Sequence, residues 1–362
     1  SYLERVSIQD SITGLVVETP TVRLSNCHIN NTEKVGLTVQ TDTIDLDLNG
    51  TVVEHGQSTG ILAKVTKAFR LRNGTTQHNH GSGIVLFGTS APTTVETMNI
   101  VNNSLHGLET QVTKHINKGV LHIKSNRFVD HGLGGSGLQL HYTSVSNTKV
   151  YVEQNSFSNN VKSMDARVGS TYYRYSENSC VIKGNIFKST GQVSAYSGNL
   201  ASLYIEDNSF KSSFGGDKCF LNVEVDDTRG GDKVQNISLS TNSFQNITGR
   251  CVVYVKSTKF EFNGTLTYNQ IFSSPTDEGT VLLDSKNVSL YYNTFDNPRA
   301  DYELKILLTG EEQINAEHNW WGSADPAIAG QRILHKDLDQ RLLKVDYLPL
   351  LTDQNFDCSE QL

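Results

Sequence analysis

Residues 150–157 read VYVEQNSF, and residues 203–210 read LYIEDNSF. In both stretches apolar and polar residues alternate, and an asparagine then stands two residues before a phenylalanine. Alternation of this kind is typical of a β-strand that buries one face. Because two distant stretches share one pattern, the sequence indicates a structural unit that repeats along the chain.

The same asparagine recurs at intervals of 23 to 34 residues. The series is Asn26, Asn49, Asn73, Asn103, Asn126, Asn155, Asn185, Asn208, Asn242, Asn269, Asn293 and Asn319. Between its members lie further short apolar runs, such as GLTV at 36–39 and CVVYV at 251–255. Short strands repeated at such a period stack on their equivalents in neighbouring turns. The sequence therefore predicts an all-β fold, a parallel β-helix (solenoid) of about 12 turns.

Each asparagine is predicted to point inward at the same bend of its turn, where its amide bonds to the equivalent amide of the next turn. Two residues later, a column is expected to pack in the interior: His28, Thr51, Thr75, Leu105, Phe128, Phe157, Phe187, Phe210, Phe244, Ile271, Phe295 and Trp321. From the fifth turn onward this column is nearly all hydrophobic. The first three turns lack that stack, so we expect them to be less stable.

The pattern ends after residue 318. Residues 319–322 read NWWG, and Asp325-Pro326 reads as the start of a helix. The last turn of a solenoid exposes strand edges that must be covered. We therefore expect one domain, with β-helix repeats at 1–318 and a short helical and aromatic cap with a tail at 319–362.

Composition excludes some partners. The 362 residues carry a formal net charge of −7 with no run of Lys and Arg, which argues against nucleic acid. No apolar stretch is long enough to cross a bilayer, so no membrane insertion of this segment is expected, and no signal peptide is recognisable. Ser1 leads directly into a repeat-like segment, so the chain is expected to be part of something longer.

Eight Asn-X-Ser/Thr sequons indicate either chance or an extracellular, glycosylated protein, and we favour the second. Asn49 and Asn73 are expected to be poor acceptors, because they belong to the predicted inward column. The remaining candidates are Asn30, Asn102, Asn236, Asn246, Asn263 and Asn287. Of these, Asn236, Asn263 and Asn287 each lie six residues before an asparagine of the series, which predicts an outward column on consecutive turns.

The chain has five cysteines, so one is left over in any pairing. Cys219 and Cys251 open matching strands, and a stacking distance of about 4.8 Å between strands suits a disulfide. We therefore predict a bridge between them. The partners of Cys27, Cys180 and Cys358 stay open.

The pair His-Gly occurs at 55–56, 80–81, 106–107 and 131–132. Because it recurs at almost every turn, we interpret it as a structural bend with stacked surface histidines rather than a catalytic pair. A histidine column that binds a metal or responds to pH is the alternative.

Two long insertions remain. Asp226, Asp227 and Asp232 lie in one of them and are weak calcium candidates, with a solvated loop as the favoured alternative. The other carries Arg167, Tyr172, Tyr173, Arg174 and Tyr175, residue types that are enriched in protein interfaces, so it is a candidate partner-contact loop. No catalytic residues and no cofactor site are recognisable, and the chain is not expected to be an enzyme.

The chain resembles the right-handed parallel β-helix superfamily, which includes pectate lyases and periplasmic copper-site assembly proteins. The resemblance is carried by the Asn-X-Phe turns at Asn126, Asn155, Asn185 and Asn208. The closing segment, with NWWG at 319–322 and VDY at 345–347, is similar to that of β-helix domains in large animal surface proteins, in particular an invertebrate tricellular-junction family. The catalytic residues of the enzyme members do not map onto this sequence.

That resemblance implies an extracellular module acting in cell–cell adhesion or junction assembly, with other cell-surface proteins or a second copy of itself as partner. The alternative is a carbohydrate-active enzyme or carbohydrate-binding module that uses the face of a sheet. A groove with paired carboxylates would favour the alternative.

Overall fold

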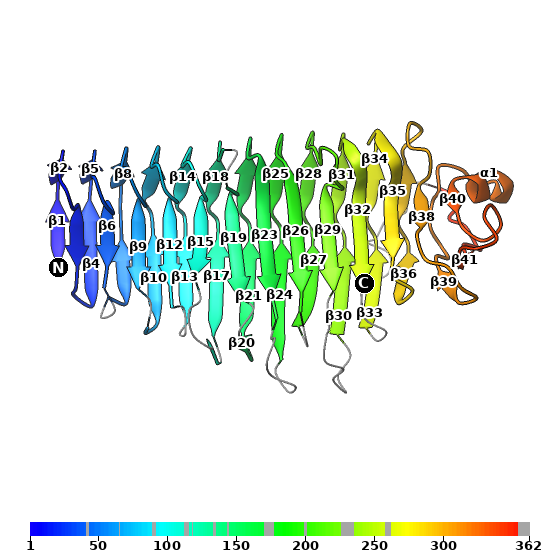
Figure 1. Cartoon of the computed structure of the whole chain (residues 1–362), viewed down its shortest axis with the longest axis horizontal. Helices are drawn as coiled ribbons and strands as arrows, with labels where there is room; N and C mark the ends of the chain where they lie inside the picture. Colours follow the sequence, from blue (N-terminus) through cyan, green and yellow to red (C-terminus); the bar gives the residue numbers. More distant parts are fainter. Residues whose placement is uncertain are drawn as a thin grey trace. The chain divides into compact units, whose positions relative to one another are not determined.

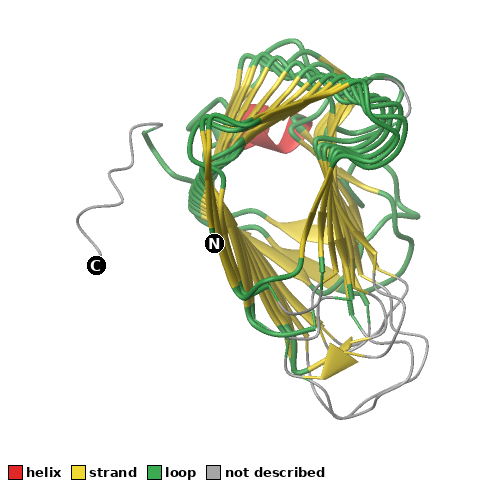
Figure 2. Cartoon of the chain, turned by 90° about the vertical axis from the view of Figure 1, so that its left-hand side faces the viewer, coloured by secondary structure: helices red, strands yellow, loops and turns green. Residues whose placement is uncertain are grey.

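A computed structural model describes residues 1–40, 43–64, 66–88, 92–111, 116–117, 119–132, 135–142, 145–169, 177–198, 201–225, 235–257 and 262–353. The chain divides into two compact units, one of residues 1–186 with 198–201 and the other of residues 187–197 with 202–362. In each unit, each complete turn of the coil places one strand in each of three parallel sheets, which we name A, B and C (Figures 1 and 2). The predicted parallel β-helix is therefore confirmed.

The first unit contains three parallel sheets and one small additional strand pair. Sheet A contains β1 Tyr2–Glu4, β4 Thr21–Ser25, β7 Asp45–Asp47, β10 Phe69–Arg72, β13 Thr93–Glu96, β17 Val120–Lys124, β21 Lys149–Glu153 and β24 Asn178–Lys183. Sheet B contains β2 Ser7–Gln9, β5 His28–Asn30, β8 Val52–Glu54, β11 Thr75–Gln77, β14 Asn99–Val101, β18 Arg127–Val129 and β22 Ser156–Ser158. Sheet C contains β3 Leu15–Val17, β6 Leu37–Val39, β9 Ile61–Lys64, β12 Ile84–Phe87, β15 Leu108–Gln111, β19 Leu138–Tyr142 and β23 Lys162–Val168. The additional pair is β16 Ile116–Asn117 with β20 Val145–Ser146.

The second unit repeats this plan. Its sheet A strands are β27 Ala201–Glu206, β30 Gln235–Ser240, β33 Phe262–Thr267 and β36 Val288–Tyr291. Its sheet B strands are β25 Ile186–Lys188, β28 Ser209–Lys211, β31 Ser243–Gln245, β34 Gln270–Phe272 and β37 Thr294–Asp296. Its sheet C strands are β26 Gln192–Ser197, β29 Leu221–Val225, β32 Gly249–Ser257, β35 Thr276–Asp284, β38 Leu304–Ile306 and β40 Ile333–Leu334.

A ladder of asparagine amides lines the first bend, between sheets A and B. In the first unit Asn126 Nδ2 donates to Asn155 Oδ1, and Asn155 Nδ2 to Asn185 Oδ1, both at 3.1 Å. In the second unit the same bond runs through consecutive turns at 2.9–3.0 Å, joining Asn208, Asn242, Asn269, Asn293 and Asn319. Each of these asparagines is buried. The bonds satisfy both protons of most amides, because the second proton is donated to a backbone carbonyl of the preceding turn.

The ladder does not extend to the first four asparagines of the series, so that part of the prediction is wrong. Asn26, Asn49 and Asn73 are exposed. Asn26 and Asn73 have φ of 51° and 62° and occupy the left-handed position just before the inward one. Asparagine is favoured in both places, and a shift of one residue turns a side chain from the interior to solvent. The inward positions of these early turns are held instead by Cys27, Thr51, Gly74 and Met98.

Asn103 belongs to a second ladder, at the bend between sheets B and C. Asn79 Nδ2 donates to Asn103 Oδ1 at 2.9 Å, and one turn later His131 takes the equivalent place. The backbone N–H of His131 then donates to Asn160 Oδ1 at 3.1 Å. The series predicted from the sequence therefore contains asparagines from two different bends.

Aromatic rings stack along the interior of sheet B. Phe128 and Phe157 stack with centroids 4.8 Å apart in the first unit. In the second unit the stacked pairs are Phe187–Phe210, Phe210–Phe244 and Phe295–Trp321, at 4.5–4.7 Å. The earlier turns fill this column with Ile29, Val53, Thr76 and Ile100 rather than with the predicted His28, Thr51, Thr75 and Leu105. The predicted column was counted two residues after each asparagine. Because the early asparagines are not the inward residues of their turns, the count falls on the wrong residues there.

The last turn of the second unit is covered by α1 Pro326–Gln331 and by a short pair of strands, β39 Gln313–Asn315 and β41 Lys344–Asp346. Asp325 caps α1, since its Oδ1 accepts from the Ala327 N–H at 2.8 Å. Glu303 is buried and accepts from Arg332 Nη2 at 3.0 Å and from Thr280 Oγ1 at 2.6 Å. This ion pair ties the segment after α1 to the last strands of sheet C.

Candidate functional site

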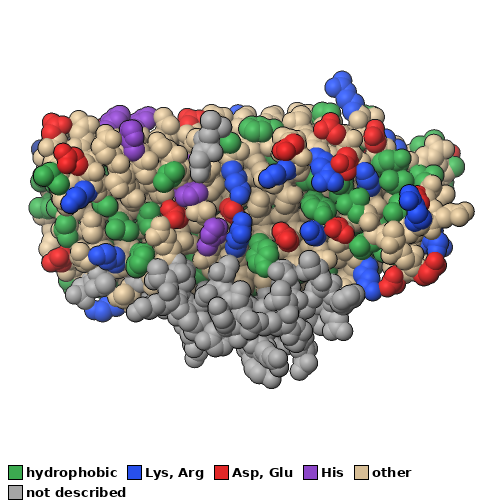
Figure 3. Space-filling view, viewed as in Figure 1, with side chains coloured by type: hydrophobic (Ala, Val, Ile, Leu, Met, Phe, Trp, Pro, Cys, Tyr) green, Lys and Arg blue, Asp and Glu red, His purple; other side chains and the backbone are tan. Residues whose placement is uncertain are grey.

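Charged side chains cluster on the outer face of sheet C in the first unit. Asp165 on β23 lies at the centre, and its side chain is 9% exposed. Its Oδ2 accepts from Lys162 Nζ at 2.8 Å and its Oδ1 from Arg167 Nε at 3.2 Å. His141 Nε2 lies 3.9 Å from Oδ2, which is an ion-pair distance rather than a hydrogen bond. Basic, acidic and histidine side chains are interspersed over this face (Figure 3).

The surroundings of Asp165 keep it ionised. Burial by itself would raise the pKa of this carboxyl, but His141, Lys162 and Arg167 outweigh burial and hold the pKa far below its usual range. A carboxylate in this state can stabilise positive charge, but with so low a pKa it is a weak base, and it cannot act as an acid near neutral pH.

A second carboxylate shares the column. The register of β15, β19 and β23 aligns Glu109 with Gln139 and Gln139 with Asp165. The two carboxylates are therefore two strands apart, roughly 9.6 Å at the spacing of a parallel sheet. Glu109 accepts from Ser82 Oγ at 2.9 Å and from Gln111 Nε2 at 2.8 Å. Paired carboxylates at about this separation occur in inverting glycoside hydrolases.

This cluster is not among the sites predicted from the sequence. Arg167 was expected in a partner-contact loop, whereas it belongs to β23 and faces Asp165. The signal in the sequence is weak: Lys162, Asp165 and Arg167 stand close together, but His141 joins them only through strand pairing. The other residues assigned to that loop, Tyr172, Tyr173, Arg174 and Tyr175, lie outside the described residues, as do Asp226, Asp227 and Asp232.

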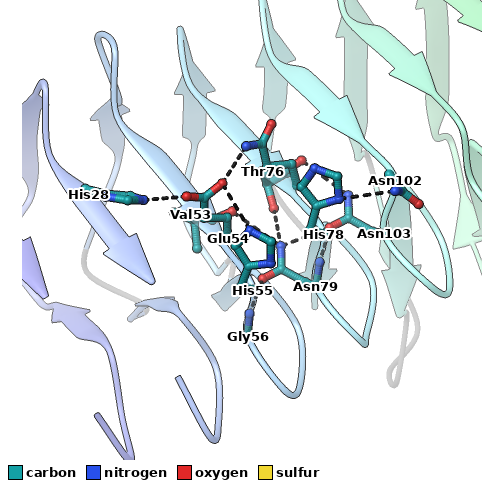
Figure 4. Close-up of polar contacts among 11 residues, drawn as sticks. His28, Val53, Glu54, His55, Gly56, Thr76, His78, Asn79, Asn102 and Asn103 are labelled. Carbon is teal, nitrogen blue, oxygen red and sulfur yellow. Dashed lines mark hydrogen bonds and ion pairs between the residues drawn. The ribbon is translucent and has the colours of Figure 1, made fainter. Parts of the chain in front are cut away.

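A second polar network surrounds Glu54 on the outer face of sheet B (Figure 4). Glu54 Oε1 lies 2.6 Å from His28 Nε2, and Oε2 accepts from Gln77 Nε2 and lies 3.8 Å from His55 Nε2. Burial would raise the pKa of Glu54, but hydrogen bonds from Gln77 and His28 and the charges of His28 and His55 lower it. His78 stacks on His55 at 5.1 Å. These contacts join three consecutive turns.

The four His-Gly pairs do not share one position, so their interpretation as a single repeated bend is wrong. His55 has φ of 52° and stands at the left-handed position of the bend between sheets B and C, where glycine was expected to supply the positive φ. His131 lies one residue further, in the buried ladder. His106 lies further still and accepts from the Ser136 N–H at 3.0 Å. Among the residues that the structure describes, His55 is the one member of the four that stacks on another histidine, and its partner His78 precedes no glycine.

His131 is a buried histidine whose pKa is strongly lowered. It is 0% exposed, and its ring nitrogens lie 3.4 Å from the Asn103 carbonyl and 3.2 Å from the Ile100 carbonyl. Burial lowers its pKa to about 4, because the charged ring cannot be solvated. His131 is therefore a structural residue of the β-helix interior and is inaccessible to a ligand.

In the part of the chain that the structure describes, no three His, Cys, Asp or Glu side chains are grouped so that they could hold a metal ion. Within the same residues, no helix has the length and apolar character needed to cross a membrane.

Cys219, two residues before β29, forms a disulfide with Cys251 on β32 of sheet C, with Cα atoms 4.4 Å apart. The bridge is buried and packs against Leu282. Cys27 and Cys180 are buried free thiols, and Cys358 lies outside the described residues.

The sequons differ in accessibility. Asn236 pairs in register with Asn263, both exposed, and the carbonyl of half-buried Asn287 accepts the next bond of that column. Asn102 and Asn246 are exposed at the bend between sheets B and C, and Asn30 is half-buried on β5. Asn49 and Asn73 are exposed, so the expectation that they point inward is wrong.

Comparison with known proteins agrees with the fold. Residues 13–179 match the family model described as right handed beta helix region. Together with the solenoid, this match supports the right-handed parallel β-helix superfamily. The chain is also similar to Protein bark beetle of Drosophila melanogaster, with 35% identity over 72 residues. That alignment covers 20% of this chain and 2% of the relative. No solved structure matches the chain.

Proposed function

We propose that this chain is an extracellular β-helix module of a larger surface glycoprotein and acts in cell–cell adhesion or junction assembly. The observation that carries the proposal is the similarity to Protein bark beetle, in agreement with the resemblance of the closing segment to tricellular-junction proteins. The partners would be other cell-surface proteins or a second copy of this chain.

Two features of the second unit support an extracellular location. The Cys219–Cys251 disulfide is typical of an oxidising compartment, since cytosolic thiols are kept reduced. The sequons at Asn236 and Asn263 lie exposed and in register on sheet A. A folded glycoprotein needs its acceptors at the surface.

The outer face of sheet C in the first unit is the candidate contact surface. Arg167 is 52% exposed there and leads into the segment that holds Tyr173 and Arg174. Arginine and tyrosine are over-represented among residues that dominate interface energies. Self-association should therefore depend on this face.

The test is sedimentation of the secreted protein over a range of concentrations, together with a cell-aggregation assay. We expect concentration-dependent association that Arg167→Ala weakens and that Arg127→Ala, a matched change on the outer face of sheet B, leaves unchanged. Alanine at Tyr173 and Arg174 tests the adjoining segment. A monomer at every concentration that also fails to bind epithelial cells would refute the proposal.

A second candidate function is carbohydrate recognition or cleavage, favoured by the Asp165 and Glu109 column. The test is binding and cleavage of a panel of acidic polysaccharides, with Asp165→Asn and Glu109→Gln as variants and Glu33→Gln as control. Activity lost in the first two variants alone would favour this candidate over adhesion.

A further inference from the structure

A pocket opens at the bend between sheets B and C in the second unit. It has a cavity volume of about 290 Å³. Its lining comes from three consecutive turns: Asn246, Ser273, Ser274, Pro275, Asn297, Pro298 and Arg299. Small-molecule sites span roughly 300–1,000 Å³, so this pocket suits one sugar ring rather than a longer ligand.

Asn246 is the sequon asparagine of Asn246-Ile247-Thr248, and it stands at the rim of this pocket. It is exposed and has φ of 54°, a conformation that asparagine tolerates better than most residues. Among the residues that the structure describes, its side-chain amide makes no hydrogen bond. Thr248, the third residue of the sequon, is also exposed. The side-chain amide of Asn246 is therefore uncommitted, and Asn246 is one of the residues that line the cavity.

The equivalent sequon of the first unit is different. Asn102 occupies the left-handed position of the same bend, with φ of 47°. Its Nδ2 lies 3.1 Å from His78 Nδ1, so its amide is already engaged. The combination of a free acceptor amide and an adjoining cavity is thus specific to Asn246 within this pair.

The walls of the pocket have the chemistry that a sugar requires. The rings of Pro275 and Pro298 supply apolar surface for the C–H groups of a pyranose. Arg299 is exposed and carries guanidinium donors for hydroxyl and N-acetyl oxygens. Sugar sites generally combine an apolar wall with a few placed polar groups.

Two of the residues that line the pocket, Ser274 and Asn297, are held in place by hydrogen bonds. Asn297 is buried, and its backbone N–H and side-chain amide donate to the Glu303 carboxylate at 2.7 and 2.9 Å. Ser274 Oγ accepts from the Ile247 N–H at 3.1 Å, and the Ser274 N–H donates to Asn297 Oδ1 at 2.9 Å. A preformed site binds without the cost of ordering its own groups.

We propose that Asn246 carries an N-linked glycan whose first N-acetylhexosamine folds back into this pocket. The glycans at Asn236 and Asn263, on the open face of sheet A, would project into solvent instead. This inference rests on the proposed secreted glycoprotein and deepens it, because it makes one sequon part of the folded surface.

The experiment uses the whole chain secreted from eukaryotic cells. Site-resolved mass spectrometry first measures the occupancy of each sequon. Native digestion with a peptide N-glycanase then follows release at each site with time. We expect Asn246 to be occupied and released about tenfold more slowly than Asn263, a ratio that corresponds to about 1.4 kcal/mol of sugar–protein contact.

Two variants show whether slow release at Asn246 comes from contacts in the pocket or from poor access of the enzyme to the site. Arg299→Ala should speed release at Asn246 and leave Asn263 unchanged, whereas Lys211→Ala, an exposed cation on sheet B, should change neither site. Release at Asn246 as fast as at Asn263 and insensitive to Arg299→Ala would overturn the inference. So would an empty Asn246 beside an occupied Asn263, and in that case the secreted glycoprotein would still stand. If no sequon is occupied in protein that was secreted, both ideas fail.

Discussion

Replacing His131 with asparagine should remove part of the acid sensitivity of the first unit. His131 stands in the ladder between Asn103 and Asn160, where both neighbours are asparagines. Its pKa is about 4 in the folded chain, against about 6.5 when unfolded. At a pH above the pKa of the unfolded chain, neither state binds the proton, so titration of this ring does not lower the free energy of unfolding.

The direction of the change in stability with pH follows from where the proton binds. As pH falls from about 6.5 to about 4, the unfolded chain takes up a proton on this ring while the folded chain does not, so the free energy of unfolding decreases. A difference of about 2.5 pKa units corresponds to roughly 3 kcal/mol. His131→Asn has no titrating group at this position and should lose about that much less stability over the same range.

The assay is urea unfolding at several pH values between 7.5 and 4, read by circular dichroism and by hydrogen exchange of the amides of Asn103 and Asn160. At pH 7.5 the variant should lie within about 1 kcal/mol of the parent, because new ladder bonds of about 1 kcal/mol each offset lost ring contacts. His80→Asn, at an exposed histidine, is the control and should keep the parent's pH dependence. Equal pH dependence in His131→Asn and the parent would refute the reasoning.

Three further predictions concern the second unit. Asn242→Ala removes one amide from the ladder and leaves its partners on Asn208 and Asn269 unsatisfied. The free energy of unfolding, measured with denaturant, should fall by roughly 1–3 kcal/mol. An unchanged unfolding midpoint would contradict a stabilising role of the ladder. Phe210→Ala opens a cavity between Phe187 and Phe244 and should cost about 3–5 kcal/mol in the same assay, whereas Phe272→Ala on the half-buried outer side should cost clearly less. The paired change Cys219→Ser with Cys251→Ser should cost about 2–4 kcal/mol, and a peptide map of the parent that found both thiols free would remove the premise.

Part of the site could be anticipated and part could not. The disulfide between Cys219 and Cys251 follows from two cysteines at matching strand starts, because stacked strands bring equivalent positions within bonding distance. The Asp165 cluster does not follow in the same way. His141 and Asp165 are 24 residues apart, and only the register of β19 against β23 places one beside the other.

The sequence by itself determined the parallel coil. Asn155 and Phe157 recur with their neighbours at fixed offsets, and a repeated inward amide followed by an inward ring is compatible with few folds. The tertiary structure alone decided which bend each asparagine serves. Asn26 faces solvent, because a left-handed bend and an inward ladder both favour asparagine and the two positions differ by a single residue of register. Asn103 belongs to the second ladder, because the bend between sheets B and C also holds inward asparagines. The surface sites depend on that register. Which charges meet on sheet C, and which sequon adjoins a pocket, is fixed by the variable length of each turn rather than by the repeat.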